Sequence, residues 1–194
     1  MDLKVILKGC LARKTQHQKL FYEQRYGYAL RIAFRYINEQ KQAEVLVNEA
    51  FAKLFQDVDF FELSLKNEAE AIVKNYIKNQ VVYRAVDKLF SARVTDKEST
   101  IDLTKVTVLH LSHENSNMKD QVIFLLKYLP QWHRILFNMH VIDGFSLLEI
   151  ARHFNTSVSA CTVDLNAART FLEKLMSKAA RPFLPFEQTM PIAK

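Results

Sequence analysis

Apolar residues recur every three or four positions along most of the chain, a spacing that places them on one face of an α-helix. This spacing predicts helices over residues 1–19, 19–37, 41–58 and 70–93 in the first half of the chain. Few stretches alternate with a period of two, and three glycines and four prolines are far below average usage. We therefore expect an all-α protein.

The strongest amphipathic pattern of this half lies in residues 41–58. Its apolar stripe must face a core, and it consists of Ala43, Leu46, Val47, Ala50, Phe51, Leu54, Phe55 and Val58. The opposite face carries Glu44, Val45, Asn48, Glu49, Ala52 and Gln56.

Residues 70–93 carry a basic stripe on a helical wheel of about 100° per residue. The stripe contains Lys74, Lys78, Arg84 and Lys88. The positions opposite to it, which we expect in the core, are Ile72, Tyr76, Val82, Tyr83, Val86 and Phe90. Such a stripe can neutralise phosphates, and Tyr76 and Tyr83 could stack on an unpaired base. The alternative is that both tyrosines are core residues and the lysines are merely solvated.

The C-terminal half contains a complete run of helix start and stop signals. A helix with one apolar face follows Leu129-Pro130 and runs to about His140, and Asp143-Gly144 closes it with a turn. Ser146 and Glu149 then form a capping box at the start of a short helix.

The short helix breaks at Asn155-Thr156, and Ser157 caps a long helix that reaches about Lys178. Two helices joined by a tight turn, the second longer, predict a helix-turn-helix. An ordinary helical hairpin is the alternative.

Between the two halves, the composition shifts to Ser, Thr, Asp, Lys and Asn. We therefore predict two small helical domains joined by a flexible linker. The expected parts are a first domain over 1–92, a linker over 93–117, a second domain over 118–180 and a tail over 181–194.

Charge and composition narrow the function. A formal charge of +6 suggests a polyanionic partner. Cys10 and Cys161 do not suggest a disulfide framework, and no apolar run is long enough to span a membrane, so we expect a cytoplasmic protein without a membrane partner. His110 and His113 lack a cysteine or carboxylate cluster, so no metal site is expected. No catalytic motif is present, so we expect no enzyme, no cofactor and no small-molecule substrate.

Six short motifs of the C-terminal half resemble, in order and spacing, the promoter-reading domain of bacterial sigma factors. They are Leu129-Pro130, Gly144-Phe145-Ser146, Glu149-Ile150-Ala151, Thr156-Ser157-Val158, Ala168-Arg169 and Leu172. The most similar branch is the extracytoplasmic-function (ECF) group. LuxR-type response regulators share the Glu-Ile-Ala helix-turn-helix, so only the first half of the chain can distinguish a sigma factor from such a regulator.

In the first half, the stretch from Ala43 to Phe51 resembles the sigma helix that docks on the coiled coil of the largest RNA polymerase subunits. The usual family pattern is Ala-Glu-Asp-Leu-Val-Gln-Glu-Val-Phe, and this chain has Val45 and Asn48 in place of the aspartate and the glutamine. The resemblance implies that the core-polymerase-binding residues are Glu44, Val45, Asn48, Glu49 and Ala52.

Residues 70–93 are implied to be the promoter-melting part. The DNA-binding residues expected there are Lys74, Tyr76, Lys78, Tyr83, Arg84 and Lys88. Two registers fit the family pattern. One aligns Val86 to Phe90 with the family's Ile-Asp-x-Leu-Arg, and the other, seven residues earlier, places Asn79 on the family asparagine.

The long C-terminal helix is implied to read the promoter. The residues expected to face the major groove, with its N-cap, are Ser157, Ser159, Ala160, Thr162, Val163, Asn166 and Arg169, and Arg152 and Lys174 are candidate phosphate contacts. The family commonly places lysine, serine and arginine after the first turn and arginine before Ala168, where this chain has Thr162, Val163, Asp164 and Ala167. We expect Asp164 to repel the DNA backbone.

The resemblance implies an ECF-type sigma factor that binds core RNA polymerase and directs promoter recognition and transcription initiation. Its partners are core RNA polymerase, promoter DNA and, in many members, an anti-sigma factor. The alternative is a helix-turn-helix regulator or degenerate sigma paralogue that acts without core polymerase. A requirement for core polymerase before promoter binding separates the two.

Overall fold

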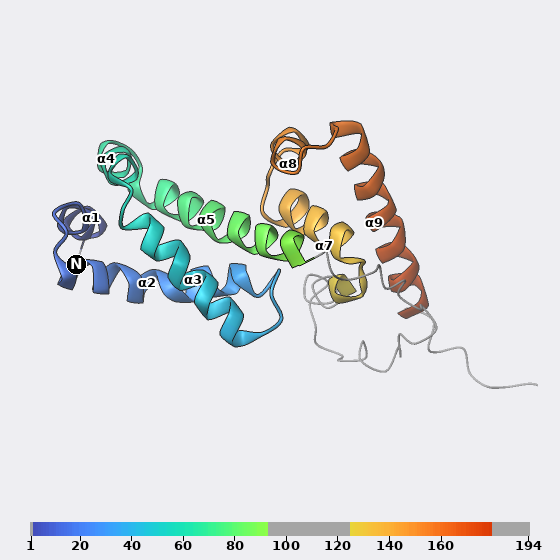
Figure 1. Cartoon of the computed structure of the whole chain (residues 1–194), viewed down its shortest axis with the longest axis horizontal. Coiled ribbons are helices and arrows are strands. Elements are labelled where there is room, and N and C mark those ends of the chain that lie inside the picture. Colours follow the sequence, from blue (N-terminus) through green and yellow to red (C-terminus); the bar gives the residue numbers. More distant parts are fainter. Residues whose placement is uncertain (1, 93–124, 180–194) are drawn as a thin grey trace, which may run out of the picture. The chain divides into compact units, whose positions relative to one another are not determined.

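The computed structural model describes residues 2–92 and 125–179. Every regular element in these two ranges is helical, so the prediction of an all-α protein is confirmed (Figure 1). The described residues before 93 belong to one compact unit together with Val141–Gly144, and the other described residues after 124 belong to a second unit. The predicted linker over 93–117, the tail over 181–194 and the pair His110 and His113 lie outside the described residues.

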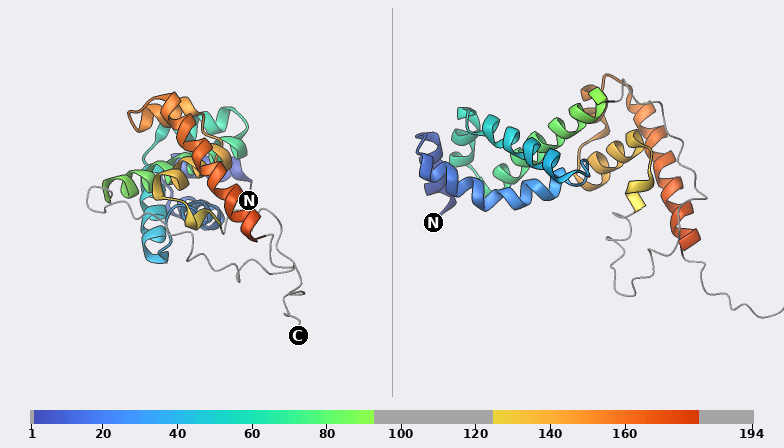
Figure 2. Two further views of the ribbon diagram at one scale, coloured as in Figure 1. Left: turned by 90° about the vertical axis from the view of Figure 1, so that its right-hand side faces the viewer. Right: turned by 60° about the horizontal axis from the view of Figure 1, so that its bottom comes forward.

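Five helices build the described part of the first unit. They are α1 (Leu3–Leu11), α2 (Thr15–Ala33), α3 (Gln40–Leu54), α4 (Val58–Lys66) and α5 (Ala69–Ala92). α2 contacts α1, α3 and α5, while α4 contacts α1 and α5 (Figures 1 and 2). The buried faces of these helices therefore enclose one shared core.

The corner between α1 and α2 is tight. Arg13 adopts the left-handed backbone region at φ 54°, and its N–H donates to the Cys10 carbonyl at 2.9 Å. The Lys14 N–H donates to the Gly9 carbonyl at 2.9 Å, so the carbonyls at the end of α1 are satisfied. This corner brings Gly9 against His17 in the first turns of α2.

The apolar stripe predicted for α3 is the centre of the core, but its last member was misassigned. Ala43, Leu46, Val47, Ala50, Phe51 and Leu54 are buried, and the Phe51 ring meets the Phe21 ring of α2 edge-on at 6.2 Å. The helix ends at Leu54, and Val58 begins α4. The prediction of one helix over 41–58 was therefore wrong.

α4 begins where Asp57 supplies an N-cap. Its Oδ1 accepts the Phe60 N–H at 3.0 Å, and its Oδ2 accepts the Tyr76 hydroxyl of α5. The hydrogen bond from Tyr76 is the main cause that lowers the pKa of the Asp57 carboxyl. The Tyr76 ring also lies against Phe60, with ring centroids 4.2 Å apart. One aspartate thus ends the α3–α4 turn and ties it to α5.

The core face predicted for α5 was partly wrong. Of the six positions expected in the core, Val82 and Val86 are buried, whereas Phe90 is 44% exposed. The buried positions are Ala69, Val73, Ile77, Val81, Val82, Ala85 and Val86. Residues four apart advance by about 40° around a helix. The buried stripe therefore winds around α5, which contacts α2, α3 and α4.

After residue 124, the described residues form a short 3₁₀ turn and three longer elements. They are η3 (Leu126–Tyr128), α7 (Gln131–Phe137) with its π-helical continuation η4 (Asn138–Ile142), α8 (Leu147–His153) and α9 (Val158–Ala179). α9 packs on α7 and α8. The predicted helix after Pro130 was correct in place, but it widens into a π turn at Asn138 and extends past His140.

Both predicted caps of this unit are confirmed. The Ser146 Oγ accepts the Glu149 N–H at 3.2 Å, and the Glu149 carboxylate accepts the Ser146 N–H at 2.8 Å. The Ser157 Oγ accepts the Ala160 N–H at 3.0 Å at the start of α9. Between α8 and α9, Asn155 takes a left-handed conformation at φ 50°. Local hydrogen bonds thus fix where both helices begin.

Cys10 makes the free energy of unfolding of the first unit depend on pH in the alkaline range. Burial raises the pKa of its thiol from 9.0 to about 11. The unfolded thiol ionises first, so its contribution to stability is complete below about pH 9 and is lost as the pH rises toward 11. We expect the gap in unfolding free energy between wild type and Cys10→Ala to narrow across this window in denaturant titrations. A gap that stays constant from pH 8 to pH 11 contradicts the prediction.

Candidate binding surfaces

The polar face of α3 points away from the core. Val45 is 50% exposed, Asn48, Glu49 and Ala52 are exposed, and Glu44 is half-buried. These positions are spaced so that they form one strip along the helix, opposite the buried stripe. Among the described residues, none forms an ion pair with Glu49. The strip therefore offers carboxylate and amide groups beside one apolar side chain.

Two tyrosines of α2 border this strip, and the sequence reasoning missed them. The Tyr22 hydroxyl donates to the Asn48 Oδ1 at 2.7 Å. The Tyr22 and Tyr26 rings lie 5.1 Å apart, and the Tyr22 ring meets Phe51 at 4.9 Å. Burial, followed by the neighbouring Glu44 charge, raises the pKa of Tyr26, and burial raises that of Tyr22 as well. The spacing of four residues between Tyr22 and Tyr26 was the sequence signal that could have identified this pair.

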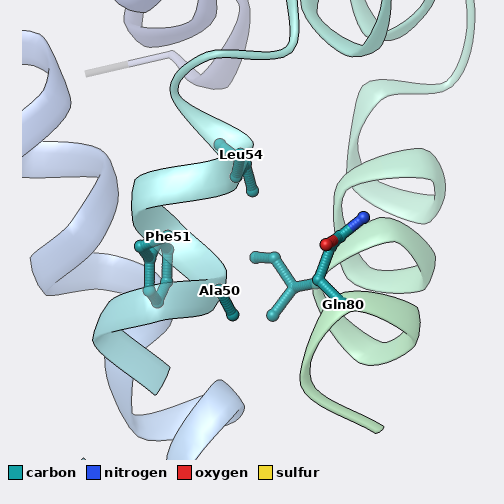
Figure 3. Close-up of a pocket in the computed structure, with 5 residues that line it drawn as sticks. Ala50, Phe51, Leu54 and Gln80 are labelled. Atoms are coloured by element: carbon teal, nitrogen blue, oxygen red, sulfur yellow. The ribbon is translucent and has the colours of Figure 1, made fainter. Parts of the chain in front are cut away.

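The other side of α3 meets α5 around a shallow depression of about 140 Å³ (Figure 3). Its lining residues are Ala50, Phe51, Leu54, Ile77 and Gln80. Ligand pockets are usually about 300–1,000 Å³ and carry convergent polar groups. The depression has no room for a water molecule and its lining is mostly apolar, so it is a feature of helix packing.

The basic residues of α5 differ in how they are held. Lys74 lies 3.1 Å from the Glu70 carboxylate, which also accepts two hydrogen bonds from Arg25 of α2 at 2.8 and 2.7 Å. The hydrogen bond from Arg25 is the main cause that lowers the pKa of Glu70. Because Arg25 already balances Glu70, the Lys74 ammonium adds net positive charge to this part of α5.

Further along α5, some of the predicted DNA-contacting residues are exposed, and others are half-buried or held by neighbouring residues. Lys88 is exposed, whereas Lys78, Tyr83 and Arg84 are half-buried. The Arg84 Nη1 donates to the Gln80 carbonyl at 3.2 Å and to its side-chain oxygen at 2.5 Å. Tyr76 is held by Asp57 and Phe60, so its ring belongs to the α4–α5 packing.

The predicted reading face of α9 is exposed along its first four turns. The exposed members are Ser157, Ser159, Ala160, Thr162, Val163, Asn166 and Arg169, and the two candidate phosphate contacts Arg152 and Lys174 are exposed as well. Val163 is 65% exposed. The Thr162 hydroxyl donates to the Val158 carbonyl at 2.8 Å, within the same helix.

Asp164, expected to repel DNA, is half-buried and has a partner in α7. Its Oδ2 accepts the indole N–H of Trp132 at 2.7 Å. The Trp132 ring also meets Phe154 edge-on at 5.0 Å. The aspartate thus has a packing role that its spacing on α9 did not reveal.

No helix in residues 2–92 or 125–179 combines the length and apolar character needed to cross a bilayer. The same residues contain no group of three or more side chains suited to bind a metal ion.

The described residues form two compact helical units, and α3 and α9 each expose one face. The family model described as ECF sigma factor matches residues 15–178. The chain therefore belongs to the ECF sigma factor family. A comparison with curated proteins gave no significant match. Members of this family are non-enzymatic regulators with a role in transcription initiation, and they partner with core RNA polymerase, promoter DNA and often anti-sigma factors.

Proposed function

We propose that the protein binds core RNA polymerase through the polar strip of α3 and directs it to promoters. The observation that carries the proposal is this strip, in which Asn48 and Glu49 are exposed beside Val45 while the opposite face of α3 is buried. Polar, partly acidic groups on a rigid helix suit a basic partner surface. The strip lies inside the matched range 15–178.

The basic residues of α5 act in promoter melting under this proposal. Lys74 and Lys88 are exposed cations that can neutralise phosphates of the opened strands. Tyr76 and Tyr83 are the candidates for stacking on an unpaired base, and the Tyr76 ring is engaged by Asp57 and Phe60 in this conformation.

α9 reads upstream promoter DNA as the second helix of a helix-turn-helix under the same proposal. Its exposed face offers Asn166 for a base edge, Val163 for a thymine methyl group and Arg169 for phosphate or base contact. Few cations lie on this face, so its contribution to binding depends only weakly on salt. Joint binding by both units compensates for weak single contacts through effective concentration.

The test is binding to purified core RNA polymerase, measured by fluorescence anisotropy of labelled protein. We expect Glu49→Lys to weaken binding by at least about tenfold, because a new cation faces a basic partner. Glu62→Lys is the matched control. It reverses a charge on α4, where Glu62 lies 3.8 Å from Lys66, and we expect unchanged affinity.

Two results contradict the proposal. Equal binding by wild type, Glu49→Lys and Glu62→Lys removes the assigned role of the strip. If wild type does not bind core polymerase but shifts promoter DNA alone, the protein is a helix-turn-helix regulator or degenerate paralogue instead.

A further inference from the structure

We infer that Tyr22 and Tyr26 of α2 extend the docking strip of α3 and, with Glu44, form a site for an arginine side chain of core RNA polymerase. The inference rests on the proposed function and deepens it. It assigns Tyr22 a second task, which is to position the Asn48 amide.

The positioning contact is direct. The Tyr22 hydroxyl donates to the Asn48 Oδ1 at 2.7 Å, across 26 residues of sequence. Asn48 is exposed, and a side chain at the surface otherwise samples several rotamers. The Tyr22 ring is itself fixed by its edge-on contact with Phe51 at 4.9 Å. The hydroxyl therefore holds the amide with its N–H₂ donors directed away from Tyr22.

The two rings and the carboxylate match the chemistry of a guanidinium. Tyr22 and Tyr26 have centroids 5.1 Å apart, and Glu44 acts electrostatically on both hydroxyls. The Gln40 Nε2 donates to the Glu44 Oε1 at 2.8 Å, which orients the carboxylate. Arginine stacks on aromatic faces and pairs with carboxylates through its planar fork, whereas lysine offers a single point charge.

The negative charge of the arginine site and its overlap with the strip of α3 identify core RNA polymerase as the partner that binds there. Glu44 and Asn48 belong both to this site and to the strip of α3, so one partner surface covers them together. α2 and α3 are in contact along the first unit, and both belong to the matched range (Figure 2). The expected partner surface is a helix that presents an arginine toward α2 and further basic residues toward Glu49.

The experiment measures the affinity of full-length variants for purified core RNA polymerase by anisotropy. Tyr22→Phe keeps the ring and removes the hydroxyl, and we expect about a fivefold loss, the effect of one hydrogen bond. Tyr26→Leu keeps apolar bulk and removes the aromatic face, and we expect about a three- to tenfold loss. Thermal unfolding of each variant checks that the fold is retained.

Tyr28→Phe is the matched control, because it also removes a tyrosine hydroxyl from α2. The Tyr28 hydroxyl donates to the Lys74 carbonyl at 3.3 Å, toward α5 and away from α3. We expect this variant to bind core polymerase with wild-type affinity.

A double-mutant cycle tests the positioning role itself. If Tyr22 acts through Asn48, Tyr22→Phe has an effect within about twofold when it is added to Asn48→Ala. An equal loss in both backgrounds overturns the positioning role. If Glu49→Lys weakens binding while Tyr22→Phe and Tyr26→Leu behave like Tyr28→Phe, the arginine site is wrong and the proposed function stands. If wild type does not bind core polymerase, both fail.

Discussion

Trp132→Ala is expected to lower the unfolding free energy of the second unit by about 3–5 kcal/mol. The Trp132 ring packs edge-on against Phe154 at 5.0 Å, and its indole N–H donates to Asp164 at 2.7 Å. Truncation removes the aromatic contact area and leaves the half-buried Asp164 without its indole donor. Because small domains are stable by only about 5–15 kcal/mol, the loss is a large part of the total.

The matched comparison for this change is Trp132→Phe. Phenylalanine keeps most of the ring contact with Phe154 and removes only the indole donor, so we expect a loss of about 1–3 kcal/mol. Denaturant unfolding followed by far-UV circular dichroism measures both variants. In the wild type, Trp132 is the single tryptophan of the chain, and its fluorescence reports the second unit alone. If both variants unfold at the same denaturant concentration, the ring contact carries none of the assigned stability.

The Trp132–Asp164 contact also bears on DNA binding. The acceptor lies on α9 between Val163 and Asn166, two members of the proposed reading face. A negative charge at this position is unfavourable near phosphates. In its partnered form, however, Asp164 contributes to holding α9 on α7. The sequence shows the charge, and only the fold shows its partner.

Much of the fold could be predicted from the sequence because its signals are local. The buried stripe of α3 follows from a regular spacing of three and four, and the capping box of Ser146 and Glu149 follows from a spacing of three. α4 was not predicted because it is short and Val58 continues the spacing of the α3 stripe by chance. The capping aspartate, Asp57, was the signal that distinguishes a new helix from a longer one.

The remaining errors have a tertiary origin. A helical wheel assumes that one direction stays buried, but α5 contacts α2, α3 and α4 in turn, and its buried stripe winds accordingly. The exposed strip of α3 could be predicted from its own spacing. The contacts that α2 makes with α3 and α5 could not be predicted, because Tyr22 and Asn48 are 26 residues apart and Arg25 and Glu70 are 45 apart. Their roles in binding polymerase and DNA stay predictions.

One substitution, glycine to alanine, is expected to have opposite effects at two positions of the first unit. Gly9 is buried in α1, and an added Cβ meets the imidazole ring of His17 and lies 2.6 Å from the His17 Cβ. The His17 Cβ is bonded to the α2 backbone, so α1 and α2 must separate to relieve the contact. We therefore expect Gly9→Ala to lower the free energy of unfolding by about 1–3 kcal/mol. Gly27 is exposed within α2, with only the Arg31 Nη1 near it at 3.9 Å.

At Gly27 the added methyl group meets no obstacle and restricts the unfolded chain, so Gly27→Ala is expected to stabilise the protein by about 0.5–1 kcal/mol. Denaturant unfolding monitored by far-UV circular dichroism gives the sign of both changes. Two stabilising results contradict the close approach of α1 to α2, since helix propensity alone favours alanine at either site. A destabilising Gly9→Ala with a stabilising Gly27→Ala ties α1, which precedes the matched range at residue 15, into the core that supports the polar strip of α3.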